Sequence, residues 1–106
     1  MALRYWAYIF LSPGFDAKQH VAVLESEQCR YKTIGIEMNK KEQVVEVAKQ
    51  LVAEGVQMIE LCGGFGPTWI AKVSEAINGA IPIGGVFYGP EARKPILEIL
   101  NPESSK

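Results

Sequence analysis

The hydrophobic residues of the chain alternate between a helical pattern and a strand pattern. The clearest helical stripe has the spacing i, i+3, i+4 and i+7 and consists of Val44, Val47, Ala48 and Leu51. Asn39 and Glu42 resemble a capping box in front of this stripe, and Gly55 is suited to its end. The pattern therefore predicts an amphipathic helix between about residues 39 and 55.

Four short and nearly continuous apolar runs predict buried strands, namely "RYWAYIFL", "YKTIGIEM", "VQMIELC" and "IPIGGVFYG". A second helix is expected from Pro67 to Asn78-Gly79, and a third to about Leu100, with a kink or restart at Pro95. Residues 16–24 fit either a short helix capped by Asp16 or an extended segment.

Strands that alternate with helices predict a single α/β domain over residues 1–106. We expect about four β-α units and a mainly parallel sheet with helices on both faces, in a flavodoxin-like or partial-barrel arrangement. Such a small sheet has two edges that need protection, so we expect a homo-oligomer.

Composition excludes several classes of function. The 106 residues carry a net charge of −1 with scattered basic residues, which argues against a nucleic-acid surface. No apolar run reaches the length of a membrane span, and the aromatic opening segment reads as a strand rather than a signal peptide. Cys29 and Cys62 with a single histidine give too few ligands for zinc. We expect a cytoplasmic protein with reduced thiols, no metal and no cofactor.

Three similar turns are expected to meet at the carboxyl edge of the sheet, where parallel strands end and open α/β folds bind ligands. They are "SPGFD", "CGGFGPT" and "IGGVFYGPE". Glycine permits close approach of a ligand to backbone N–H groups, although it also serves simply to make a tight turn. The candidate ligand-binding residues are Asp16, Glu60, Gly63, Gly64, Phe65, Gly66, Gly84, Gly85 and Tyr88.

Glu60 interrupts an apolar strand, where a carboxylate is costly unless it is hydrogen-bonded, paired or close to water. It is a candidate general base or ligand anchor. The simpler interpretation is that it accepts hydrogen bonds from the N–H groups of the following turn.

Cys62 is a candidate nucleophile at the start of a helix, with His20 as the only imidazole that could serve as its base. The simpler interpretation is a small buried side chain for Cys62 and a surface pair between Asp16 and His20. Glu37 is a second acid at the end of a strand.

The segments "GFDAKQH", "EVAKQLVAEGVQMIELCGGFGP" and "IPIGGVFYG" resemble a family of small prokaryotic proteins of unknown function. The resemblance covers about Tyr5 to Leu100, and "ELCGGFGP" is its most specific part. It implies one recurring small domain and assigns no catalytic residue.

The sequence therefore predicts a small protein that binds a polar metabolite at the carboxyl edge as a homo-oligomer. Two alternatives stay open: an enzyme that uses Glu60 as a base or Cys62 as a nucleophile, and a structural subunit without a ligand.

Overall fold

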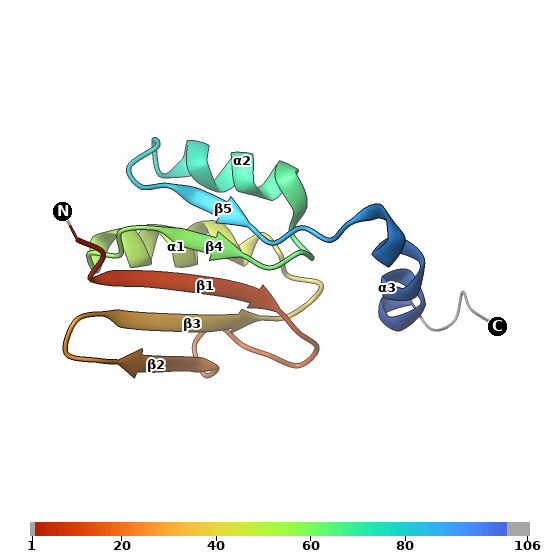
Figure 1. The fold of residues 1–106 in the computed structure, drawn as a ribbon, viewed down its shortest axis with the longest axis horizontal. Helices are drawn as coiled ribbons and strands as arrows, with labels where there is room; N and C mark the ends of the chain where they lie inside the picture. Colours follow the sequence, from red (N-terminus) through yellow and green to blue (C-terminus); the bar gives the residue numbers. More distant parts are fainter. Residues whose placement is uncertain (1, 102–106) are drawn as a thin grey trace.

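The computed structural model describes residues 2–101 as one mixed sheet with helices (Figure 1). The strands are β1 (Tyr5–Leu11), β2 (Val21–Glu25), β3 (Arg30–Ile36), β4 (Ile59–Leu61) and β5 (Ile83–Gly85). The helices are α1 (Gln43–Ala53), α2 (Gly66–Ala76), the 3₁₀ turn η1 (Pro90–Ala92) and α3 (Arg93–Leu100).

The strand order is β2-β3-β1-β4-β5, and only β2 runs antiparallel to its neighbour. Strands β1, β3, β4 and β5 are parallel, so their carboxyl ends meet at one edge. Residues 16–24 do not form the short helix considered above. The extended alternative is confirmed for Val21–Glu25, which forms the hairpin strand β2 and makes the sheet mixed rather than wholly parallel.

Both long helices lie on the same side of the sheet, which corrects the expectation of helices on both faces. The crossovers β3-α1-β4 and β4-α2-β5 run in the same direction across the sheet, and right-handed connections then place both helices on one face. Helices α1 and α2 contact each other there, and α1 lies behind the sheet in Figure 1. A flavodoxin-like arrangement is therefore not confirmed.

The core lies between the sheet and these two helices. Because side chains alternate along a strand, every second strand residue lies on the side of this core and the others lie on the opposite side of the sheet. The members of the core are Ala7, Ile9, Ile34, Ile36, Val44, Val47, Ala48, Leu51, Val56, Ile59, Leu61, Phe65, Val73 and Ile77. The opposite side of the sheet, which we call the open face, carries the alternate strand positions Trp6, Tyr8, Phe10, Ala22, Leu24, Tyr31, Thr33, Gly35, Glu60 and Gly84. Trp6 is half-buried on the open face.

The helix ends agree with the sequence in most details. Gly55, Asn78 and Gly79 adopt positive φ after α1 and α2, as the predicted exits require. Glu42 is the N-cap of α1, but no side-chain hydrogen bond caps that helix, so the capping box at Asn39 was wrong. The restart predicted near Pro95 corresponds to the change from η1 to α3.

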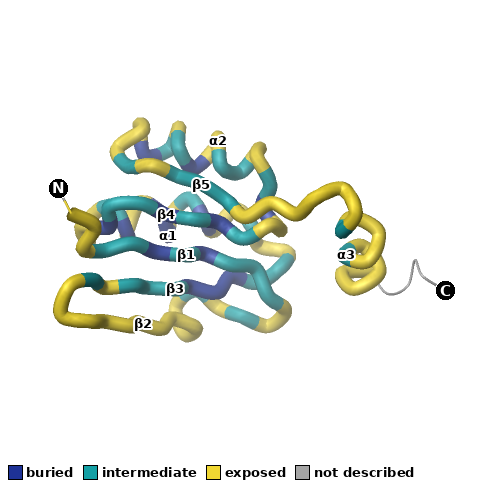
Figure 2. Tube along the Cα trace, in the orientation of Figure 1, coloured by how far each residue is buried: buried dark blue, intermediate teal, exposed yellow. Residues whose placement is uncertain are grey.

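Helix α3 lies beyond the carboxyl edge rather than on the sheet (Figure 1). It is exposed along most of its length (Figure 2). Within residues 2–101 no helix combines the length and apolar character needed to cross a membrane.

Candidate functional site

The carboxyl edge carries a pocket between the sheet and α3, which we call the edge pocket. Its volume is about 350 Å³. The lining residues are Leu11, Met38, Cys62, Gly63, Gly64, Tyr88, Ile96, Ile99 and Leu100. Most of these side chains are apolar, so the pocket suits a molecule with an apolar body rather than a wholly polar one.

The turn between β4 and α2 supplies the backbone of the edge pocket. Within residues 2–101 the N–H groups of Gly63 and Gly64 donate no hydrogen bond, whereas the N–H of Phe65 donates to the Cys62 carbonyl at 3.1 Å. Gly66 has a φ of +75°, a conformation that favours glycine, and Pro67 occupies the first turn of α2 as expected. Two free donors therefore border the pocket.

Three of the candidate ligand-binding residues, Phe65, Gly84 and Gly85, do not lie in exposed turns as the sequence suggested. Phe65 is buried in the core with 4% exposure, so it is not available to a ligand there. Gly84 and Gly85 lie inside β5 and pair with Glu60 and Leu61, because the strand extends further than the turn motif suggested.

Glu60 lies on the open face beside Tyr8, its partner in the β1–β4 ladder. Within residues 2–101 its carboxylate makes no hydrogen bond or ion pair, so the interpretation that it binds the following turn is wrong. Burial raises the pKa of Tyr8, and the negative charge of Glu60 contributes in the same direction. Glu60 is thus a half-buried acid that does not belong to the lining of the edge pocket.

The structure does not bring Cys62 and His20 together. The Leu11 N–H donates to Cys62 Sγ at 3.3 Å, and the Asp16 N–H donates to His20 Nδ1 at 2.8 Å. His20 lies just before β2, and Cys62 lies just after β4. Two strands, β3 and β1, separate β2 from β4, so the two residues are about 14 Å apart across the sheet. The pair that nucleophilic chemistry would require is not formed.

Asp16 and Glu37 hold turns near the carboxyl edge. Asp16 Oδ1 accepts a hydrogen bond from the Lys18 N–H at 2.8 Å, as in an Asx turn. Glu37 accepts from the N–H groups of Gly14 and Met38 at 3.2 and 2.6 Å, which is the local role considered for Glu60.

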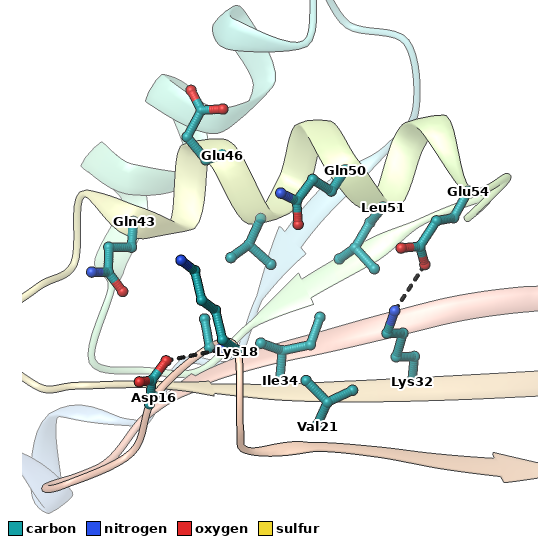
Figure 3. A pocket seen from close by; sticks show the side chains of 12 residues that line it. Asp16, Lys18, Val21, Lys32, Ile34, Gln43, Glu46, Gln50, Leu51 and Glu54 are labelled. Atoms are coloured by element: carbon teal, nitrogen blue, oxygen red, sulfur yellow. Dashed lines mark hydrogen bonds and ion pairs between the residues drawn. The ribbon is translucent and has the colours of Figure 1, made fainter.

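A second pocket lies between α1 and the β2–β3 hairpin, and we call it the α1 pocket (Figure 3). Its volume is about 310 Å³. Val21 and Ile34 form the sheet side in Figure 3, and Gln43 and Glu54 extend from α1 toward the sheet, whereas the Glu46 carboxylate points away from it. The sequence did not predict this pocket, because the pocket depends on β2 lying at the edge of the sheet beyond the part that α1 covers. The polar stripe of α1 was a signal, but a solvent-exposed helix face has the same pattern.

Two charged groups of the α1 pocket, Lys32 and Glu54, form an ion pair. Lys32 Nζ donates to Glu54 Oε1 at 2.9 Å, and the Tyr5 hydroxyl donates to the same oxygen at 3.2 Å. The hydrogen bond from Lys32 lowers the pKa of Glu54, while burial and then the bond to Glu54 raise the pKa of Tyr5. This pairing explains the lysine in a strand and engages its amine, whereas the Lys18 side chain, which also lines the pocket, makes no ion pair within residues 2–101.

Substituting Glu54 by glutamine should change how stability depends on pH. Because the folded pKa of Glu54 is below its usual 4.5, the ionised carboxylate stabilises the folded state. This stabilisation is complete above the unfolded pKa and is lost as the pH falls through the folded pKa. We expect Glu54→Gln to lower the free energy of unfolding at pH 7 by less than about 1 kcal/mol, since the carboxylate is partly exposed. Urea denaturation at pH 7 and pH 3 should show this difference shrinking at pH 3.

The matched control is Glu46→Gln, whose exposed carboxylate lies 3.6 Å from Lys49. It should leave the pH dependence unchanged. A Glu54→Gln effect of equal size at both pH values would contradict the role of the ionised carboxylate.

Comparisons with known proteins agree with the resemblance noted in the sequence. Among residues 2–101 no group of three or more histidine, cysteine or acidic side chains is arranged to hold a metal ion. Neither the curated proteins nor the solved structures contain a significant match to the chain. The model of a family of unknown function, DUF6506, matches residues 4–101, nearly the whole chain. The chain therefore belongs to the family of unknown function DUF6506.

Proposed function

We propose that the chain binds a small amphipathic molecule in the edge pocket. The observation that carries this proposal is the combination of a mostly apolar lining with two unpaired backbone donors, the N–H groups of Gly63 and Gly64. An apolar body would pack against Leu11 and the residues of α3. An acceptor group of the ligand would accept hydrogen bonds from the free N–H groups.

The polar end of the ligand is best accounted for by an anion such as a carboxylate. Gly63 and Gly64 lie just before α2, whose N-terminus carries partial positive charge. Arg93 lines a shallow cavity that adjoins the edge pocket through Gly63, Tyr88 and Ile96. These groups replace Glu60 as the orienting elements of the proposed site, because Glu60 lies on the open face.

The enzymatic alternative has less support than ligand binding. The base required by Cys62 is held elsewhere, and Glu60 does not line the edge pocket. Binding without turnover requires neither group.

Octanoate is a suitable probe because it joins an apolar chain to a single carboxylate. In a Cys29→Ser background, we expect octanoate to slow the alkylation of Cys62 by iodoacetamide, because Cys62 lines the edge pocket. Gly63→Leu should weaken this protection at least tenfold by filling the pocket. A Cβ at Gly63 would lie 3.0 Å from the Tyr88 ring, which is exposed and can move aside.

Ala80→Leu is the control, since this exposed residue precedes β5 at the opposite edge of the sheet. It should leave the protection unchanged. The proposed site is wrong if saturating octanoate does not alter Cys62 alkylation, or if both variants protect Cys62 as well as the parent protein does.

A further inference from the structure

The structure leaves two apolar surfaces uncovered on the same chain. The first is the open face, which lies on the side of the sheet opposite to α1 and α2. The second is α3, where Leu97, Ile99 and Leu100 are 49%, 72% and 54% exposed, Ile99 and Leu100 at the border of the edge pocket. Isolated exposed side chains are ordinary, but two continuous apolar surfaces indicate an interaction site.

The open face is aromatic and organised. The rings of Trp6 and Tyr31 have centroids 4.5 Å apart, and those of Tyr8 and Phe10 are 6.4 Å apart. The Phe10 ring continues to Phe15 at 5.3 Å. Aromatic rings in contact form a firm surface that loses little side-chain entropy when a partner covers it.

The chain is more extended than a compact domain of its length, because α3 lies beyond the sheet (Figure 1). Its radius of gyration is 14.7 Å, whereas a compact domain of 106 residues has about 13 Å. Its accessible surface is 7066 Å², whereas a monomer of 11.7 kDa typically exposes about 5,900 Å². The excess is of the same order as the roughly 800 Å² that each partner buries in a standard interface.

Charge favours a second copy of this chain as the partner. Glu60 is the only charged side chain among the strand positions of the open face, and it has no ion-pair partner within residues 2–101. Helix α3 begins with Arg93 and Lys94. One chain thus presents both an apolar helix with cations and an apolar sheet with an unpaired acid.

We infer that two copies of the chain form a dimer in which the open faces pack together and α3 of each copy lies against the other. A twofold interface of this kind is self-complementary, so the same surface serves both copies. It buries the aromatic rings, brings Arg93 and Lys94 to the side of the partner's acid, and covers α3. The dimer does not require the proposed ligand, although residues of α3 contribute both to the edge pocket and to this interface.

Gly84→Lys tests the open face without disturbing the monomer. A Cβ at Gly84 would meet no atom within 4 Å, so the side chain has space in a single copy. Between two packed sheets the lysine would be desolvated. In sedimentation velocity on ligand-free protein, we expect the unsubstituted chain to be a dimer and Gly84→Lys to raise its dissociation constant at least a hundredfold.

Ala53→Lys is the matched control, since this exposed residue ends α1 on the other side of the sheet. It should remain dimeric, and all variants should keep the same far-ultraviolet circular dichroism. A chain that is monomeric up to high micromolar concentration overturns the inference. So does a Gly84→Lys variant that dimerises as tightly as the parent, because association would then occur at the sheet edges.

Ile99→Lys tests the contribution of α3. Ile99 is exposed in the monomer, so the substitution should not unfold a single copy. We expect a dissociation constant raised at least tenfold. An unchanged dissociation constant would overturn the placement of α3 against the second copy.

Discussion

Replacing Phe65 by alanine is expected to lower the free energy of unfolding by about 3–5 kcal/mol. The ring is 4% exposed and belongs to the core cluster, although it stands in the middle of the glycine-rich segment "CGGFGP". Its removal leaves a cavity where α2 begins, next to rigid backbone that cannot collapse onto it. Because small domains are stable by only about 5–15 kcal/mol, the loss should be evident in urea denaturation as a lower midpoint with an unchanged slope.

The chain contains its own control for this experiment. Phe87 follows a second Gly-Gly pair in "IGGVFYGPE", but its side chain is 64% exposed. Phe87→Ala should therefore change the free energy of unfolding by no more than about 0.5 kcal/mol. Equal losses for the two variants would contradict the burial of Phe65. They would indicate that its ring lies exposed at the carboxyl edge.

The comparison of these two rings shows what the sequence could predict. Apolar periodicity and the positions of glycine and proline are local, and they correctly predicted α1, α2 and the strands that precede them. The choice between core and surface for Phe65 and Phe87 depends on where each strand ends in the sheet. Two similar motifs therefore received the same interpretation although β5 includes its glycines and β4 ends before its own.

Strand order was the other limit of the sequence. Local patterns did not reveal that β2 forms a hairpin with β3, or that both crossovers run the same way. The first fact makes the sheet mixed, and the second leaves the open face without helices. These two facts explain the position of Glu60. Alternation along the strand shows which face of the sheet Glu60 occupies, but it does not show that α1 and α2 both cover the other face.

Some of the residues that the sequence singled out lie together in the structure, but their binding of a ligand stays a prediction. The carboxyl edge, Cys62, Gly63, Gly64 and Tyr88 were foreseen, and these residues do line one pocket there. The apolar contribution of α3 was missed, because the separation of that helix from the sheet is a long-range feature. The expected polar metabolite consequently becomes an amphipathic molecule in our proposal.

Gly35→Val is the second substitution for which we expect a large effect, a loss of about 1–3 kcal/mol in the free energy of unfolding. Valine normally favours a strand, so the substitution destabilises the protein only if the new side chain cannot be packed. A Cβ at Gly35 would overlap the Phe15 ring and lie 2.9 Å from Phe10 Cζ. Phe15 also packs on His20 with ring centroids 4.7 Å apart, so its displacement disturbs the turn that leads into β2.

Two comparisons isolate this cause. Thr33→Val lies two residues earlier on the same face of β3, where the substitution adds no bulk against a ring, and we expect a change within about 0.5 kcal/mol. In a Phe15→Leu background the cost of Gly35→Val should fall, because the side chain that it displaces is smaller and more adaptable. A cost that stays the same with and without Phe15, or a Gly35→Val protein as stable as the parent, would show that the rings do not require glycine here.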